Sequence, residues 1–149
     1  MNNGIRLTKI WFDVDIVELR VEVSDGSSVF ANEVYVAHAT LDETVSDLER
    51  FREHVHGGLY NLRFGEFGPE YANGAFQARF HFLQPGRLYV TCQQESDFVE
   101  FGKKKVASCA TMFIESEPIL LDHFITELKG LATGKLEHAI LEGVVHRRL

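Results

Sequence analysis

The sequence holds little cysteine, little proline and one tryptophan: two Cys, three Pro and one Trp among 149 residues. Two cysteines are too few for the disulfide framework of a small secreted domain, and neither Cys92 nor Cys109 belongs to the paired spacing of a zinc site. We therefore expect both thiols to be reduced. Repeats and Pro- or Ser-rich tracts are absent as well, so no domain boundary can be defended and the length predicts a single domain, residues 1–149.

Long hydrophobic runs are also missing. Nowhere does the chain contain about 18 uncharged apolar residues in succession, the length that a membrane-spanning helix needs. The stretch from Met1 to Lys9 has no apolar run of signal-peptide length. These absences, together with the sparse cysteines, lead us to expect a cytoplasmic protein.

Positive charge is in deficit, with 15 Lys and Arg against 22 Asp and Glu, which gives a formal net charge of −7. Broad nucleic-acid binding requires a basic face that displaces counterions from phosphates, so this balance argues against it. A basic protein partner suits the chain better. The same charge has a simpler interpretation, since moderate net charge keeps any small protein in solution.

What the sequence does contain is period-two alternation. From Ile16 to Val23, apolar residues alternate with charged ones, the pattern of a half-buried strand. After the turn-forming cluster at residues 24–28, a second strand is expected from Val29 to Val36, which completes a hairpin. Further strands are expected at Ile5 to Phe12, Leu59 to Phe64, Ala75 to Leu83, Arg87 to Glu95 and Val106 to Glu115.

Two segments have helical periodicity instead. The first is expected to begin near Thr40, with Glu43 completing a capping box, and to stop at Gly57-Gly58. The second is expected from about Pro118, which fits a first helical turn, to about Gly134. The remainder, residues 135–149, is compatible with a short helix or a strand, and the pattern from Ala139 to Val145 favours a strand.

The order of these elements predicts the fold class α+β: one domain with a meandering, mainly antiparallel sheet and two helices packed on one face. The strand alternations and the second helix's apolar stripe nominate a common core. Its predicted members are Val17, Leu19, Val21, Phe76, Phe80, Phe82, Phe124 and Leu128.

Motifs of known chemistry are incomplete. The run from Gly130 to Lys135 is one residue shorter than a phosphate-binding loop, is followed by Leu136 where a hydroxyl is needed, and closes a helix where that motif opens one. His54 and His56 are two residues apart near a predicted helix end, where interaction with the helix carbonyls explains them better than a metal. We therefore predict no cofactor and no metal site.

Two weaker patterns leave alternatives open. Asp13 and Asp15, near Glu18, fit either a hard-cation site or a solvated turn, and no glycine-rich calcium loop surrounds them. Neither cysteine lies in a sequence motif typical of a catalytic nucleophile. His81 or His123 can serve as the base for a cysteine only if the fold brings these distant segments together. No catalytic residue is predicted.

The segment from Phe64 to Gly74 combines aromatic residues, acids and turn formers, as a protein-binding loop does. The other interpretation is that its aromatic rings cover one end of the sheet. The candidate binding residues are Glu66, Phe67, Glu70, Tyr71 and Asn73.

The order of strands and helices, the acidic charge and the turn Gly65-Glu66-Phe67-Gly68-Pro69-Glu70-Tyr71 resemble small bacterial α+β proteins, some of them related to toxin-immunity proteins. The resemblance implies stoichiometric binding and occlusion of a partner, without catalysis, and assigns no functional residue. We therefore predict a small binding or regulatory domain of this kind. The alternative is a small-ligand-binding domain or enzyme whose site is assembled from separate segments.

Overall fold

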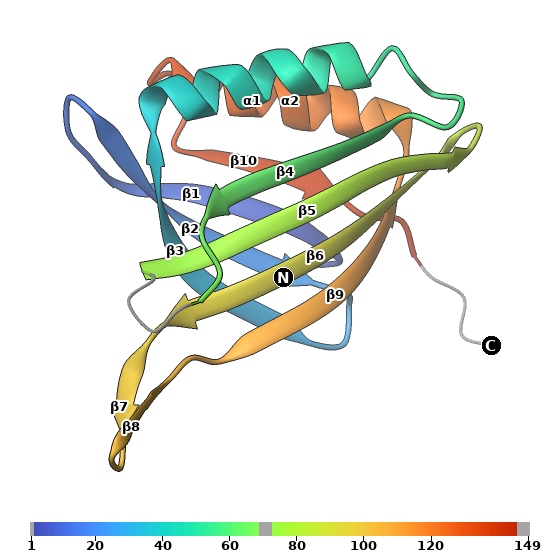
Figure 1. Ribbon diagram of the computed structural model, residues 1–149. Helices are drawn as coiled ribbons and strands as arrows, with labels where there is room; N and C mark the ends of the chain where they lie inside the picture. The colour runs from blue at the N-terminus through green and yellow to red at the C-terminus, as the bar shows by residue number, and fades with distance from the viewer. Residues whose placement is uncertain (1, 69–72, 146–149) are drawn as a thin grey trace.

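A computed structural model describes residues 2–68 and 73–145 of the chain. These residues form ten strands and two helices, whose arrangement is drawn in Figure 1. In chain order they are β1 (Gly4–Phe12), β2 (Ile16–Ser24), β3 (Val29–Ala37), α1 (His38–Phe51), β4 (Leu59–Gly65), β5 (Asn73–Gln84), β6 (Arg87–Asp97), β7 (Val99–Phe101), β8 (Lys104–Val106), β9 (Cys109–Ser116), α2 (Pro118–Ala132) and β10 (His138–Glu142).

The predicted α+β class and its antiparallel pairing are confirmed, with the meander divided between two sheets. Sheet A has the strand order β10-β1-β2-β3, and sheet B has the order β4-β5-β6-β9. Within each sheet every pair is antiparallel. Short turns join β1 to β2, β2 to β3 and β5 to β6, as antiparallel pairing allows. Strands β7 and β8 form a separate two-stranded hairpin that extends away from both sheets (Figure 1).

The inner faces of the two sheets form one core, which the helices close along one side. Figure 1 shows α1 and α2 side by side, with α2 next to β10 and α1 above β3 and β4. All eight predicted core residues are 1% exposed or less, so this prediction is confirmed. At the helix end of the core the Phe51 ring stacks on Phe82, with 4.8 Å between centroids.

The predicted limits of the first helix are wrong at both ends. Helix α1 begins at His38, and no side chain caps it, so the capping box at Thr40 does not form. The backbone N–H of His38 instead donates to the carbonyl of Asp15, in the turn between β1 and β2, at 3.1 Å. A backbone carbonyl from another segment therefore satisfies one of the N–H groups at the start of the helix that have no partner within it.

At its other end α1 stops at Phe51, six residues before Gly57. The glycines begin the next pairing instead. The N–H of Gly57 donates to the carbonyl of Phe82, and the N–H of Phe82 donates to Gly58. The pair Gly57-Gly58 thus starts a strand connection, where the sequence pattern indicated a helix stop.

The later elements follow the predictions with one change. Helix α2 begins at Pro118, and the remainder contains β10, so the strand interpretation of residues 135–149 is confirmed for His138–Glu142. The predicted strand from Val106 is split, because Lys104–Val106 pairs with Val99–Phe101 and a new strand starts at Cys109. The lysine-containing connection is therefore a hairpin.

Two buried amides join the sheets. The side chain of Gln94 in β6 donates to the Asn32 side-chain oxygen in β3 at 2.8 Å, and Asn32 donates to the carbonyl of Glu95 at 3.0 Å. Both side chains are almost fully buried, so each polar group needs a partner. The pair therefore links β3 of sheet A to β6 of sheet B inside the core.

Candidate protein-binding surface

Large apolar side chains are exposed where β1 ends and turns into β2. Trp11 is 47% exposed, Phe12 is 63% exposed and Val14 is 89% exposed, and Ile10 is half exposed as well. A register shift between Lys9 and Trp11 makes a bulge at Ile10, which redirects the strand end away from the core. The last three residues of β1 therefore expose large apolar side chains, whereas Ile5 and Leu7 earlier in the strand are buried.

The outer face of sheet A continues this surface across two more strands. Trp11 lies opposite Glu18 in β2, and Glu18 lies opposite Tyr35 in β3, so the carboxylate stands between two aromatic side chains. The negative charge of Glu18 is the main cause that raises the pKa of Tyr35, with smaller contributions from burial and from Asp97. The two rings therefore border an acidic region.

The acids of the turn have a structural role. The carboxylate of Asp13 accepts hydrogen bonds from the backbone N–H groups of Asp15 and Ile16, each at 2.8 Å, and these bonds lower the pKa of Asp13. The His38 ring bonds the carbonyl of Asp13 at 2.8 Å. This geometry supports the solvated-turn interpretation of Asp13 and Asp15. Across residues 2–68 and 73–145, no cluster of three or more metal-ligating side chains is present.

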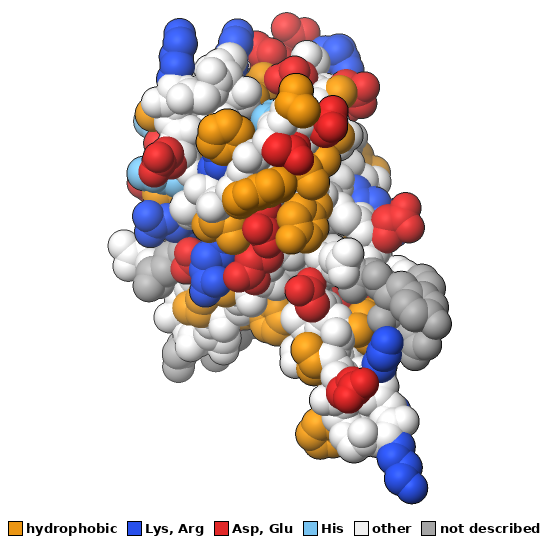
Figure 2. All heavy atoms as spheres, turned by 90° about the vertical axis from the view of Figure 1, so that its left-hand side faces the viewer, with side chains coloured by type: hydrophobic (Ala, Val, Ile, Leu, Met, Phe, Trp, Pro, Cys, Tyr) orange, Lys and Arg blue, Asp and Glu red, His pale blue; other side chains and the backbone are white. Residues whose placement is uncertain are grey.

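Figure 2 looks at the side of the molecule from which the β1–β2 turn projects, and it shows hydrophobic side chains gathered into a patch with carboxylates within and around it. We call the exposed and partly exposed side chains of this region the Trp11 surface. It comprises the apolar Ile10, Trp11, Phe12, Val14 and Tyr35 and the acidic Asp13, Asp15 and Glu18.

The predicted binding loop lies beyond strand β4. Glu66 is exposed and Phe67 is half-buried, while the N–H of Gly68 donates to the side chain of Glu95 at 2.7 Å. Asn73 is exposed and opens β5 opposite Asp97. Two further predicted residues, Glu70 and Tyr71, lie outside the described residues.

The end of this loop meets the strand that carries Tyr35. Gly74 has a φ of +89°, and a Cβ there would lie 2.1 Å from the carbonyl oxygen of Glu33 and 3.3 Å from the Asp97 carboxylate. Only glycine permits so close an approach. The fold thus brings Asn73 near the edge of the Trp11 surface, although the sequence pattern treated the two regions separately.

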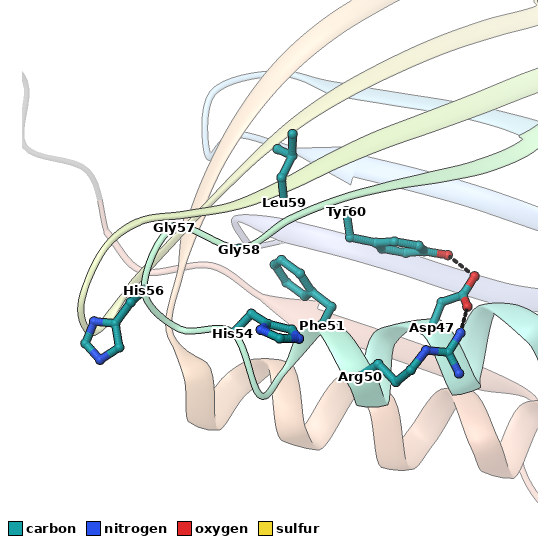
Figure 3. Close-up of a pocket in the computed structure, with 9 residues that line it drawn as sticks. All are labelled: Asp47, Arg50, Phe51, His54, His56, Gly57, Gly58, Leu59 and Tyr60. Carbon is teal, nitrogen blue, oxygen red and sulfur yellow. Dashed lines mark hydrogen bonds and ion pairs between the residues drawn. The ribbon is translucent and has the colours of Figure 1, made fainter.

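An open pocket of about 630 Å³ lies at the end of α1 and is drawn in Figure 3. Its cation, Arg50, forms an ion pair with Asp47, and the Tyr60 hydroxyl donates to the same carboxylate at 3.4 Å. Burial is the main cause that raises the pKa of Tyr60 to about 12, with the charge of Asp47 second, so this phenol is neutral at ordinary pH. The Asp47 carboxylate therefore pairs with both Arg50 and Tyr60 inside the pocket.

The histidines do not assemble a site. In Figure 3 the His54 ring lies below Phe51, whereas His56 points away at the loop tip. His123 lines a different pocket, with Glu127 and Glu142, and His81 is part of neither lining. Cys92 is buried and Cys109 is exposed, and both are free thiols. The residues described here therefore bring together no pair of histidine and cysteine as nucleophile and base.

Comparisons with protein-family models, with curated proteins and with solved structures give no match. Neither α1 nor α2 is long and apolar enough to cross a membrane.

Sequence reasoning missed the Trp11 surface, although a signal was present. Ile10, Trp11 and Phe12 are three consecutive large apolar residues, and a strand directs successive side chains to opposite faces. They cannot all enter one core. The following turn, with Asp13 and Asp15, marks the same end as solvent-exposed.

Proposed function

We propose that this chain is a protein-binding module that holds a basic partner on the Trp11 surface in a stoichiometric complex, without catalysis. One observation carries the proposal: the only tryptophan of the chain is half exposed, in a row with Glu18 and Tyr35 and beside other exposed apolar residues. Contiguous exposed apolar surface of this kind marks interaction sites in folded proteins.

The chemistry of the surface fits a protein better than a small molecule. Trp and Tyr are the residues that most often dominate the binding energy of protein interfaces, because they bury a large area with few rotatable bonds. The carboxylates of Asp15 and Glu18 attract a basic partner and orient its approach. The chain's net charge of −7 acts in the same direction.

The pocket beside α1 offers less support for the rival function, a small-ligand site. Its Arg50 is neutralised by Asp47, and its two histidines point apart. Recognition of a small ligand needs a few convergent polar groups in a concave site. The action suggested by the likeness to immunity proteins, occlusion of a partner, agrees with a surface site.

The test is affinity capture from the native cell with matched baits. The baits are the wild-type chain, the double variant Trp11→Ala/Tyr35→Ala, and the control Phe113→Ala. Phe113 is 63% exposed on the outer face of sheet B, so it is an aromatic ring at least as exposed as the tested rings but at another place. We expect a basic protein that the wild type and Phe113→Ala retain and that Trp11→Ala/Tyr35→Ala loses.

A captured protein is then purified and titrated against each bait. Truncation of an aromatic anchor costs about 2 kcal/mol or more, a loss in affinity of roughly 30-fold. Thermal unfolding of each bait verifies that folding is unaffected. Retention of every partner by Trp11→Ala/Tyr35→Ala would refute the proposal, and so would a partner lost only from Phe113→Ala.

A further inference from the structure

The β7–β8 hairpin is the second exposed feature on this side of the molecule. Val99 is 59% exposed and Phe101 is 67% exposed, and Lys103 and Lys104 at the tip are both exposed. The base of the hairpin is held by Ser96, whose N–H donates to the carbonyl of Ser108 at 2.9 Å. The hairpin thus presents apolar and basic side chains on a projecting two-stranded arm.

The hairpin and the Trp11 surface are complementary in chemistry. The hairpin tip carries Lys103 and Lys104 next to apolar Phe101, and the Trp11 surface carries Asp13, Asp15 and Glu18 among its apolar residues. Each also holds one charge of the other sign, Glu100 in β7 and Lys9, whose Nζ lies 5.3 Å from the Phe12 ring. Figure 2 shows both on the same face, with the hairpin at the bottom and the hydrophobic patch above it. Because both features lie on one face, two copies that meet through this face are related by a two-fold axis. Each hairpin then meets the Trp11 surface of the other copy, which gives two equivalent contacts.

We propose that two copies of the chain form a closed dimer in which the β7–β8 hairpin of each copy docks on the Trp11 surface of the other. The inference rests on the proposed function, since it names a second copy as one occupant of the same binding surface. In the dimer Phe101 packs near Trp11, and Lys103 and Lys104 lie near Asp15 and Glu18.

The distribution of charge favours a second copy of the chain, rather than an unrelated basic segment, as the molecule that covers the Trp11 surface when no other partner is present. The acidic chain repels its own copies at long range, so attraction arises only where a local basic group meets the local acids. The hairpin tip supplies such a group at two symmetric contacts. Exposed charge pairs are screened over roughly 8 Å at physiological ionic strength, so added salt weakens the dimer. An external basic partner must displace the hairpin, and dimerisation therefore masks the surface until that partner arrives.

A charge-swap experiment tests this arrangement. One variant is Lys103→Glu/Lys104→Glu, the other is Asp15→Lys/Glu18→Lys, and sedimentation velocity measures the assembly state across concentrations at low ionic strength. The wild type is expected to form a dimer that dissociates on addition of salt. Each variant alone faces like charges at both contacts, so its dissociation constant should rise at least about ten-fold. An equal mixture of the two variants restores opposite charges at both contacts, and it should form a 1:1 dimer with nearly the wild-type affinity.

The control is Arg63→Glu/Arg79→Glu, which changes net charge as much as the hairpin variant does but on the exposed outer face of sheet B. It should dimerise nearly as the wild type does, and circular dichroism verifies that every variant is folded. A monomeric wild type at all concentrations would overturn the inference. So would dimers that Lys103→Glu/Lys104→Glu leaves intact, or a mixture that fails to restore assembly. None of these results affects capture of a basic partner by the Trp11 surface, so the two proposals fail separately.

Discussion

The amide pair between the sheets gives a quantitative test of the fold. Replacing Gln94 by Met keeps the length and approximate volume of the side chain and removes its N–H donor. The Asn32 side-chain oxygen, which receives that donor at 2.8 Å, is then left without it in the core. The same nitrogen lies 3.3 Å from the carbonyl of Val21 and 3.2 Å from that of Phe30, so these contacts are lost too.

The cost follows from the orphaned group. A buried polar group without its partner costs about 1–3 kcal/mol, so Gln94→Met should lower the free energy of unfolding by about 2 kcal/mol. For a domain of this size that corresponds to a fall in Tm of about 4–8 °C. Asn32→Leu should cost a similar amount. Because the double variant loses the shared hydrogen bond once, its cost should fall short of the sum by about 1 kcal/mol or more.

Urea denaturation of the four proteins measures these differences, with equal slopes showing that the unfolding transition is the same. The control is Gln93→Met, one residue away on the exposed face of the same strand, which should change stability by less than about 0.5 kcal/mol. Strictly additive costs for the two single variants would show that Asn32 and Gln94 do not act as a pair, and the proposed junction of the sheets would be wrong.

Three further predictions concern single residues. Burial raises the pKa of the Cys92 thiol, so only the exposed Cys109 should react with a thiol reagent in the native protein, and both should react in denaturant. Gly74→Ala should reduce stability by roughly 1–3 kcal/mol by calorimetry, because the new Cβ would overlap the carbonyl of Glu33 and the positive φ is strained; unchanged stability would refute that close approach. The pKa of Tyr60 is raised to about 12, above its ordinary value, so its stabilising contribution is present below pH 10 and is lost between about pH 10 and pH 12. Tyr60→Phe should make the unfolding free energy less steep over that range, and an identical pH profile would contradict the assignment.

Local patterns predicted most of the fold because they report the face on which each side chain lies. The alternation of Val17, Leu19 and Val21 placed β2 correctly, and these residues are fully buried. Pro118 placed the start of α2 to the residue. Such signals depend on neighbours in the chain, which a single sequence contains.

Long-range contacts account for what the patterns did not predict. Helix α1 starts two residues before Thr40 because the carbonyl of Asp15, from a different segment, satisfies the first N–H. The contact between the two sheets involves residues far apart in the chain, such as Asn32 and Gln94, which are 62 residues apart and share a hydrogen bond. No local pattern contains this information.

The candidate site, too, depends partly on local patterns and partly on long-range contacts. Glu66, Phe67 and Asn73 were selected because aromatics and acids occur together in the loop, and their role in binding stays a prediction. The Trp11 surface requires register, since Trp11 and Tyr35 share a row only after β1, β2 and β3 are aligned. The sequence shows that the end of β1 is apolar, but it does not show that Tyr35 lies beside it.

The central claim, that partner binding covers the Trp11 surface, can be measured at one atom. Because the chain has a single tryptophan, 5-fluorotryptophan labelling places one fluorine signal at Trp11. Addition of the captured basic partner to the labelled chain should shift that signal and remove its dependence on the solvent isotope, and the change should be complete at one equivalent. A signal that keeps its position and its solvent dependence while the partner binds would contradict the account.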